Sequence, residues 1–351
     1  MSTFSFKNAA KRTFLVTGAS GFIGRAVVDF ILSTGAKVIA ADMRPINIDN
    51  ERLAFWQVDL TGDYKKLPEG ITDVIHAAGR VSDWGKYEDF HVINVTATQK
   101  LLDLARNEGV KNFLFISSID IHGFFGHNGT TEDGIYYSSK CYYPMTKALA
   151  EKEVRAFNSA QMKTVCIRPC TVYGPGDTTV QGPMMDAILK RQMGYIDKGK
   201  YLISRVYITD LVQGLCRALE YGKGGEAYNI TSGEQINWTE WVEAIAQELG
   251  AKPPKTSAPY PIAFALAASL EWLYKLFNTK NPPILTKMRI QHAGHDFFFI
   301  PEKAKTELGF APKVAWQEGV KLMVEEYKER KEAQGGKKSK KKVKKAQELN
   351  E

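Results

Sequence analysis

The sequence of 351 residues has only four cysteines, Cys141, Cys166, Cys170 and Cys216. They show neither the paired spacing of a zinc site nor the density of a secreted disulfide framework. We therefore expect reduced cysteines that pack in the core, and no metal site. Residues 1–12 also lack the apolar stretch of a signal peptide, so the sequence indicates a cytoplasmic protein.

The chain lacks an apolar run long enough to cross a bilayer, which takes about 20 residues. Its most apolar segment, residues 262–277, is shorter and is interrupted by Glu271 and Lys275. Three interpretations fit this pattern: an ordinary core helix, a helix packed over a substrate cavity, and a helix lying at a membrane interface.

A charge excess is also missing from most of the chain, although the formal net charge is +8. Seven lysines lie between residues 337 and 345, so the rest of the chain is nearly neutral. We therefore expect no nucleic-acid binding by the globular part. The Gly/Lys-rich segment 335–351 is predicted to be disordered. Together with residues 262–277 it would supply two signals for peripheral attachment to an anionic membrane; nuclear targeting, RNA contact and simple solubilisation are the alternatives.

A glycine-rich turn stands out among the features that are present. Apolar residues 14–16 predict a buried strand, residues 26–32 predict a helix, and Gly18, Gly21 and Gly24 lie between them. Such a turn frees backbone N–H groups at the helix N-terminus and lets a pyrophosphate approach closely. The pattern therefore predicts a dinucleotide-binding site.

Asp42 ends the next predicted strand, roughly 20 residues after the glycine turn. An acid at this position accepts hydrogen bonds from both adenosine ribose hydroxyls and favours NAD over NADP. Arg44 could instead pair with a 2′-phosphate, which leaves NADP open. We favour a solvated loop charge for Arg44, and therefore NAD.

Apolar strands alternate with amphipathic helices over residues 10–173. This alternation is typical of an α/β fold with a Rossmann-type, doubly wound parallel sheet covered on both faces. The rhythm changes afterwards, so residues 174–325 are predicted to form a smaller substrate-binding region. Strands at 206–211 and 227–231 are expected to return to the sheet, and residues 238–249 predict a helix.

Tyr143 and Lys147 are spaced i and i+4, which places them on one helix face. We expect the ammonium group to lower the pKa of the phenol so that it can exchange a proton with a substrate hydroxyl. Tyr136 and Lys140 have the same spacing, but Pro144 would break a helix running on from Lys140 and instead suits the first turn of a new one.

Three segments resemble the short-chain dehydrogenase/reductase superfamily, in particular its extended, epimerase-like branch. They are the glycine motif with GxxGxxG spacing, residues 113–123 (Phe-Leu-Phe-Ile-Ser-Ser-Ile-Asp-Ile-His-Gly), and residues 143–151 (Tyr-Pro-Met-Thr-Lys-Ala-Leu-Ala-Glu). The last two look most like the 3β-hydroxysteroid dehydrogenase family, which includes sterol-4α-carboxylate dehydrogenases and bacterial relatives acting on long-chain 3-oxo acids. Further similarity extends to about residue 325.

This resemblance implies an NAD-dependent dehydrogenase or reductase, and we expect a homodimer. It assigns Ser118, Tyr143 and Lys147 as the catalytic residues. The residues expected to contact the cofactor are Gly18, Ser20, Gly21, Phe22, Ile23, Gly24, Asp42, Arg44, Asp59, Leu60, Ala77, Ala78, Gly79, Asn94, Tyr143, Lys147, Pro169 and Val172. His76 is given no catalytic role, because a lone histidine is most often a hydrogen-bonded structural residue.

The substrate is expected to be a hydrophobic alcohol or ketone, namely a 3β-hydroxysteroid, a sterol or a long-chain acyl compound. Sugar-nucleotide epimerases and dehydratases resemble the first half of the chain but usually carry an arginine that pairs with the diphosphate. Ile203 lies at that position here, with Arg205 two residues further on as a candidate substitute. A sugar-nucleotide enzyme with tightly bound NAD is therefore the alternative, followed by an NAD-binding scaffold without activity.

Overall fold

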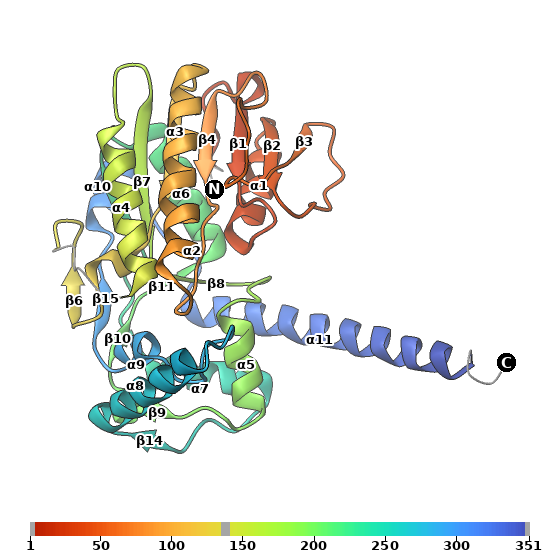
Figure 1. Cartoon of the computed structure of the whole chain (residues 1–351), viewed down its shortest axis with the longest axis vertical. Helices are drawn as coiled ribbons and strands as arrows, with labels where there is room; N and C mark the ends of the chain where they lie inside the picture. The colour runs from red at the N-terminus through yellow and green to blue at the C-terminus, as the bar shows by residue number, and fades with distance from the viewer. Residues whose placement is uncertain (1–3, 135–140, 348–351) are drawn as a thin grey trace.

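A computed structural model describes residues 4–134 and 141–347, with side chains as far as residue 334 (Figure 1). Its centre is a seven-stranded sheet in which every neighbouring pair of strands is parallel. The strand order is β12-β7-β5-β4-β1-β2-β3. The strands are β1 (Thr13–Thr17), β2 (Lys37–Asp42), β3 (Leu53–Gln57), β4 (Asp73–His76), β5 (Asn112–Ile116), β7 (Lys163–Pro169) and β12 (Ala227–Ile230).

Helices cover both faces of this sheet, which confirms the predicted doubly wound α/β fold. Side chains alternate along each strand, so Val16 packs into the core beneath α1 (Phe22–Ser33) and α6 (Ile208–Tyr221), whereas Leu15 packs into the opposite core. That second core lies beneath α3 (Ala97–Asn107) and α4 (Tyr142–Ala156). Buried strands of this kind read as continuous apolar runs, which is why the sequence identifies them.

A second region lies beyond the carboxyl ends of the strands, at the bottom of Figure 1. Its helices are α5 (Gln181–Leu189), α7 (Trp238–Leu249), α8 (Tyr260–Leu276) and α9 (Lys287–Ala293), and α10 (Glu302–Leu308) follows in the chain. A four-stranded sheet has the order β13 (Ile236–Asn237), β10 (Leu202–Ile203), β15 (Phe297–Phe299) and β6 (His127–Thr130). Two strand pairs join β8 (Thr171–Tyr173) to β11 (Arg205–Tyr207) and β9 (Tyr195–Ile196) to β14 (Ser257–Ala258).

The segment 206–211 differs from its predicted strand. Only β11 is extended there; it pairs with β8 outside the main sheet, and the chain enters α6 at Ile208. The apolar run 206–208 mimics a strand, but Leu211 and Leu215 continue it at helical spacing and are fully buried. β12 does join the main sheet, beside β7.

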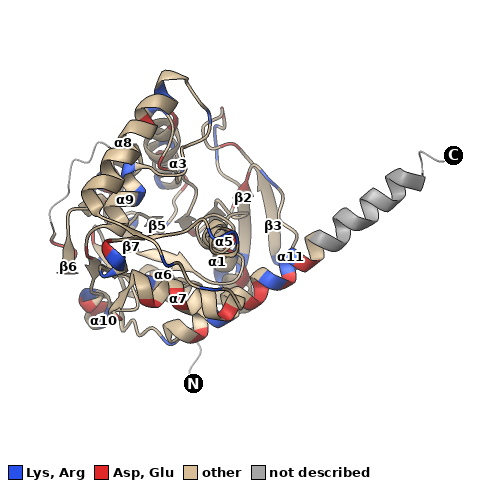
Figure 2. Cartoon of the chain, turned by 90° about the horizontal axis from the view of Figure 1, so that it is seen from below, with Lys and Arg blue, Asp and Glu red and all other residues tan. Residues whose placement is uncertain are grey.

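The lysine-rich segment also differs from its predicted disorder, because helix α11 (Trp316–Gln347) continues through it; residues 348–351 lie outside the described chain. Lysine, glutamine and alanine are favourable helix residues, and they extend a helix that is already anchored. The anchor includes the buried side chains of Val320, Val324 and Tyr327. Figure 2 shows acidic and basic residues mixed along the part of α11 next to the body.

Candidate active site

The glycine turn packs too tightly for side chains. Gly18 has a φ of 67°, and a Cβ atom there would lie 2.7 Å from the backbone nitrogen of Ala78. A Cβ on Gly24 would lie 2.1 Å from the carbonyl oxygen of Gly18. Gly21 precedes α1 without a side-chain cap, and the buried hydroxyl of Ser20 has no hydrogen-bond partner. An uncapped helix N-terminus with an unsatisfied hydroxyl beside it fits the diphosphate of a dinucleotide.

Asp42 is held against this turn. One carboxylate oxygen accepts a hydrogen bond from the backbone N–H of Ser20 at 3.0 Å, and the other accepts one from the backbone N–H of Arg44, also at 3.0 Å. The remaining lone pairs of the carboxylate can accept ribose hydroxyls. The Arg44 side chain is exposed.

The chain after β4 forms the adjoining wall, where Ala77, Ala78 and Gly79 follow one another. A Cβ on Gly79 would lie 3.2 Å from Asn94 Oδ1 and 3.9 Å from Lys147 Nζ. Small residues here therefore leave space between the turn and α4.

Asn94 links this wall to α4. It lies in a π-helical segment (Val92–Thr96), accepts the N–H of Arg80 at 2.7 Å and donates to Thr146 Oγ at 3.0 Å. π-Helical segments are rare and frequently mark functional sites.

His76 is a structural residue, as expected. It is fully enclosed, and its ring nitrogens pair with the hydroxyls of Thr17 and Thr98 at 2.7 and 2.9 Å. Burial lowers the pKa of the imidazole to about 3, so it stays neutral.

The other expected cofactor contacts lie at neighbouring strand ends. Asp59 and Leu60 follow β3, and the side chain of Asp59 accepts hydrogen bonds from Thr61, which lower the pKa of its carboxyl. Pro169 ends β7, and Val172 pairs with Val206 in the strand pair beside it.

Ser118, Tyr143 and Lys147 converge at the end of β5. Ser118 caps a short 3₁₀ helix (Ile119–His122), where its hydroxyl oxygen accepts the backbone N–H of Asp120 at 3.2 Å, and its proximity lowers the pKa of Tyr143 in part. All three side chains are buried. Pro144 lies in the first turn of α4, as the sequence argument requires. The competing residues Tyr136 and Lys140 lie outside the described residues.

We expected Lys147 to lower the pKa of the Tyr143 phenol, and this expectation is wrong for this structure. Lys147 Nζ donates to the carbonyl oxygen of Ile116 and lies 3.9 Å from the ring centroid of Phe115. Burial and the nearby charge of Asp120 raise the pKa of Tyr143, and its hydrogen bond with Ser118 only partly offsets them. Burial also lowers the pKa of Lys147 to about 7. Desolvation is the largest cause of both shifts.

Asp120 is a site residue that the sequence argument missed. Loss of hydration raises the pKa of its carboxyl to about 6, and the hydrogen bond with Ser118 lowers it in part. The sequence did contain a signal for this residue, because Asp120 is an acid that lies two residues after Ser118, the expected catalytic serine.

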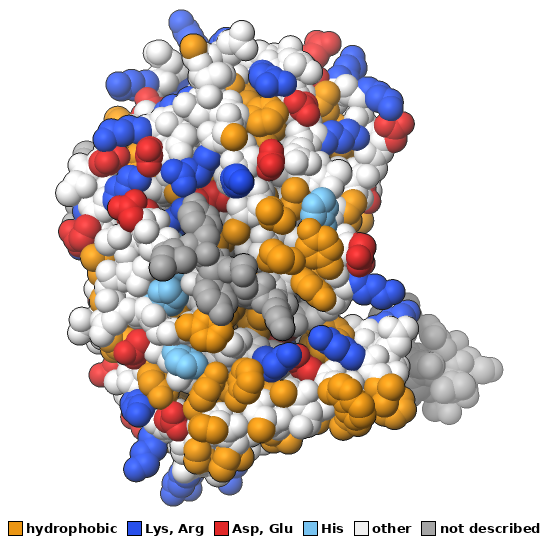
Figure 3. Space-filling view, turned by 60° about the vertical axis from the view of Figure 1, so that its left-hand side comes forward, with side chains coloured by type: hydrophobic (Ala, Val, Ile, Leu, Met, Phe, Trp, Pro, Cys, Tyr) orange, Lys and Arg blue, Asp and Glu red, His pale blue; other side chains and the backbone are white. Residues whose placement is uncertain are grey.

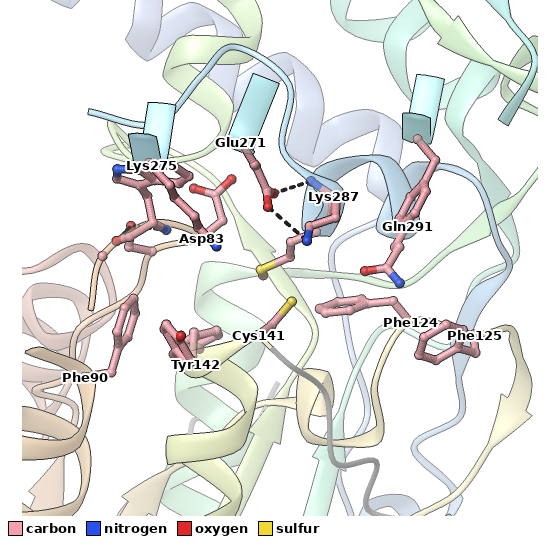
Figure 4. A pocket seen from close by; sticks show the side chains of 16 residues that line it. Asp83, Phe90, Phe124, Phe125, Cys141, Tyr142, Glu271, Lys275, Lys287 and Gln291 are labelled. Carbon is pink, nitrogen blue, oxygen red and sulfur yellow. Dashed lines mark hydrogen bonds and ion pairs between the residues drawn. The ribbon is translucent and has the colours of Figure 1, made fainter. Parts of the chain in front are cut away.

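A cavity of about 310 Å³ opens beside Tyr143 (Figure 4). Most of its lining is apolar or aromatic, which suits a hydrophobic ligand of moderate size. The loop after β4, the segment around Phe124, the start of α4, and helices α8 and α9 all contribute. The lining residues are Ser82, Asp83, Trp84, Gly85, Phe90, Phe124, Phe125, Cys141, Tyr142, Tyr143, Phe264, Glu271, Lys275, Lys287, Met288 and Gln291. Apart from Tyr143 and the α8 residues, sequence reasoning gave no signal for this wall.

Arg205 does not replace the diphosphate-binding arginine. Its side chain is 1% exposed, and its guanidinium carbon lies 5.0 and 5.1 Å from the ring centroids of Trp238 and Trp241. Ile203, at the position of that arginine, is fully buried. Arg205 is also absent from the cavity lining.

Comparisons with known proteins identify the family of this chain. The family described as "NAD dependent epimerase/dehydratase family" matches residues 14–231. The chain is 29% identical over 326 residues to a mouse sterol-4-alpha-carboxylate 3-dehydrogenase, decarboxylating, covering 89% of this chain and 90% of that protein. It is 25% identical to a 2-alkyl-3-oxoalkanoate reductase of Stenotrophomonas maltophilia, covering 88% and 97%.

A solved structure of similar fold is UDP-glucuronic acid 4-epimerase from Bacillus cereus in complex with NAD. Its TM-score is 0.71 at 22% identity, covering 90% of this chain and 99% of that one. At this identity the likeness shows the fold.

Proposed function

Because the chain belongs to the NAD dependent epimerase/dehydratase family and is an NAD-dependent oxidoreductase of the extended short-chain type, we propose that it interconverts a secondary alcohol and a ketone on a hydrophobic substrate. The substrate classes are a 3β-hydroxysteroid, a sterol or a long-chain acyl compound. The observation that carries the proposal is the position of Tyr143, which lies in the lining of an aromatic cavity at the strand end where Ser118 and Lys147 are also buried.

The residues of the glycine turn, with Asp42 and the Ala77–Gly79 segment, would hold the dinucleotide. Its nicotinamide accepts or returns a hydride when it is bound. Asp59, Leu60, Pro169 and Val172 are proposed contacts at the neighbouring strand ends.

Ser118 and Tyr143 would bind the substrate oxygen between their hydroxyls. Since burial raises the pKa of Tyr143, the phenol holds its proton at neutral pH and can deliver it to a forming alkoxide during reduction. Lys147, buried one turn along α4, would hold Tyr143 at the end of β5 through its hydrogen bond to the carbonyl oxygen of Ile116.

Burial of Arg205 disfavours the sugar-nucleotide alternative, since no arginine lines the described cavity to pair with a diphosphate. The direct test mixes purified protein with NAD and a panel of 3β-hydroxysteroids and 3-hydroxy fatty acids, and follows absorbance of reduced nicotinamide. UDP-glucose and UDP-glucuronate run in parallel with product analysis, because an epimerase interconverts sugars without net reduction. Turnover of UDP-sugars alone would overturn the proposal.

We also propose peripheral membrane contact, through the lysine-rich segment 335–351 and α8. No helix of the described chain is long and apolar enough to span a membrane. Helix α8 nevertheless buries its small residues and turns large ones outward (Figure 3); the exposed fractions are 65% for Ile262, 51% for Leu266, 64% for Trp272, 64% for Leu276 and 73% for Phe277. Residues 251–295 hold six lysines and arginines but only one acid. An apolar stripe in a basic segment matches an anionic lipid surface.

A homodimer is the remaining proposal about partners. Two apolar side chains of α4 remain partly exposed, Tyr142 at 37% and Leu149 at 39%. Sedimentation equilibrium of the full chain tests it.

A further inference from the structure

The cavity is mostly apolar; besides the polar residues Ser82 and Gln291, one wall holds four charged side chains. Figure 4 shows Asp83, Glu271, Lys275 and Lys287 together on this wall, with Cys141 and Tyr142 opposite. Charged groups in an apolar cavity cost solvation free energy unless they are paired. Their pairing therefore indicates which charges remain available to a ligand.

Both acids of the wall are already bound by the protein. Asp83 accepts the hydroxyl of Thr286 at 2.6 Å and forms an ion pair with Arg289 at 2.7 Å. Glu271 is 8% exposed; it accepts the backbone N–H of Lys287 at 2.6 Å and pairs with Lys287 Nζ at 3.3 Å. These contacts occupy the oxygens that face the protein.

The two lysines keep unused donors. Lys287 Nζ has three N–H groups, and its ion pair with Glu271, at 3.3 Å, uses at most one of them. Lys275 is solvent-exposed at the rim of the cavity, its Nζ lies 5.9 Å from the ring centroid of Trp84, and it has no carboxylate partner within the described chain. The hydrogen-bonding capacity left on this wall is therefore mainly cationic.

We propose that Lys275 and Lys287 form a subsite for an anionic group of the substrate, in the first place a carboxylate. The inference rests on the proposed function, because it places the anion on the same molecule whose alcohol or ketone reacts at Tyr143. The apolar lining binds the hydrocarbon body, and the two ammonium groups select acids over neutral analogues. The names of two curated relatives describe acids, a sterol carboxylate and an oxoalkanoate.

The first test compares matched ligands with and without the charge. With NAD, 3-hydroxydecanoate is expected to have a KM at least about tenfold below that of its methyl ester, since a charge-assisted hydrogen bond is lost in the ester. Decanoate, which has no hydroxyl to oxidise, is expected to inhibit competitively, whereas methyl decanoate inhibits weakly. Equal KM and inhibition constants for acid and ester would overturn the subsite.

The second test uses variants. Lys275→Met removes a charge without an ion pair and is expected to raise KM for 3-hydroxydecanoate about tenfold at unchanged kcat, with the ester unaffected. Lys280→Met, exposed in the same segment but outside the cavity lining, is the control. Lys287→Met should behave like Lys275→Met, and Lys287→Arg should retain acid selectivity. Because Lys287→Met also unpairs Glu271 and can impair folding, Lys275→Met decides the result.

Two sources of the anion are separated by the same assays. UDP-glucose could instead inhibit turnover of the acid, with an inhibition constant that Lys275→Met raises. That result would assign the lysines to a diphosphate and overturn the carboxylate subsite. Failure of every hydrophobic alcohol to react would instead overturn the proposed function; equilibrium dialysis of decanoate against wild type and Lys275→Met still tests the subsite in that case.

Discussion

Lys147 Nζ donates a hydrogen bond to the backbone carbonyl oxygen of Ile116, the last residue of β5. This contact ties α4 to the strand end that leads to Ser118, so Lys147 helps to hold Tyr143 and Ser118, the two proposed catalytic hydroxyls, near each other. It also shows that the ammonium serves as a structural donor before any ligand arrives. The i, i+4 spacing in the sequence predicts the shared helix face but not this partner.

Tyr143→Phe is expected to abolish turnover while leaving NAD affinity nearly unchanged, because only the proton-transferring hydroxyl is removed. Steady-state rates and NAD titration by fluorescence give the two readouts. Tyr136→Phe is the matched control and should leave both the turnover rate and the NAD affinity nearly unchanged. An inactive Tyr136→Phe enzyme together with an active Tyr143→Phe enzyme would assign proton transfer to Tyr136 instead of Tyr143.

Asp42→Ala is expected to weaken the binding of NAD more than the binding of NADP. The carboxylate accepts ribose hydroxyls in the one case and repels a 2′-phosphate in the other. The ratio of KM values for the two cofactors measures the effect, and Arg44→Ala separates the contribution of the neighbouring guanidinium. A wild-type enzyme that already prefers NADP would show that Arg44 dominates.

Lys147→Met is expected to make the fold more stable at pH 7 and to flatten its pH dependence. In the folded protein burial lowers the pKa of Lys147 to about 7, whereas the unfolded chain keeps a value near 10.5. Between these values the unfolded state binds more protons, so the free energy of unfolding of the wild type rises with pH, by up to about 5 kcal/mol over the whole interval. Urea unfolding at pH 7, 8 and 9 checks this, with the exposed Lys152→Met as control. Equal slopes for wild type and Lys147→Met would contradict it.

Truncation after Gln334 is expected to reduce binding to anionic vesicles, and the double change Trp272→Ser and Phe277→Ser should reduce it independently. Each lysine near an anionic surface contributes about 1 kcal/mol, and the apolar stripe adds contact with the acyl region. Sedimentation with anionic and with neutral vesicles, at low and high salt, separates the two contributions. Leu189→Ser, at an exposed apolar residue of α5, is the control. Unchanged sedimentation of both variants would remove membrane contact from the proposal.

The sequence predicted the parts whose chemistry depends on local spacing. Gly18, Gly21 and Gly24 identify a turn because only glycine fits there, and a Cβ at two of these positions would collide with backbone. The helix 238–249 coincides with α7, which has Asn237 and Glu240 as a capping box at its start.

The rest depends on contacts between distant segments. Asp83 and Arg289 form an ion pair although about 200 residues separate them, and no local pattern signals such a meeting. The sequence left the role of Arg205 open for the same reason, since the two tryptophans that enclose it lie more than 30 residues further along the chain. The lysine-rich segment was misread because composition alone ignores the anchored helix that precedes it.

The position of β12 at the edge of the main sheet has a consequence for synthesis of the protein. β7 ends at Pro169, but its outer neighbour β12 begins at Ala227, after the chain has made α5 and α6. At translation rates of about 5–20 residues per second the outer edge of β7 stays unpaired for several seconds on the ribosome. Unpaired strand edges invite aggregation. A fragment ending at residue 173 would retain this open edge permanently, so the nucleotide-binding half is expected to fold as a stable unit only when the chain extends past Ile230.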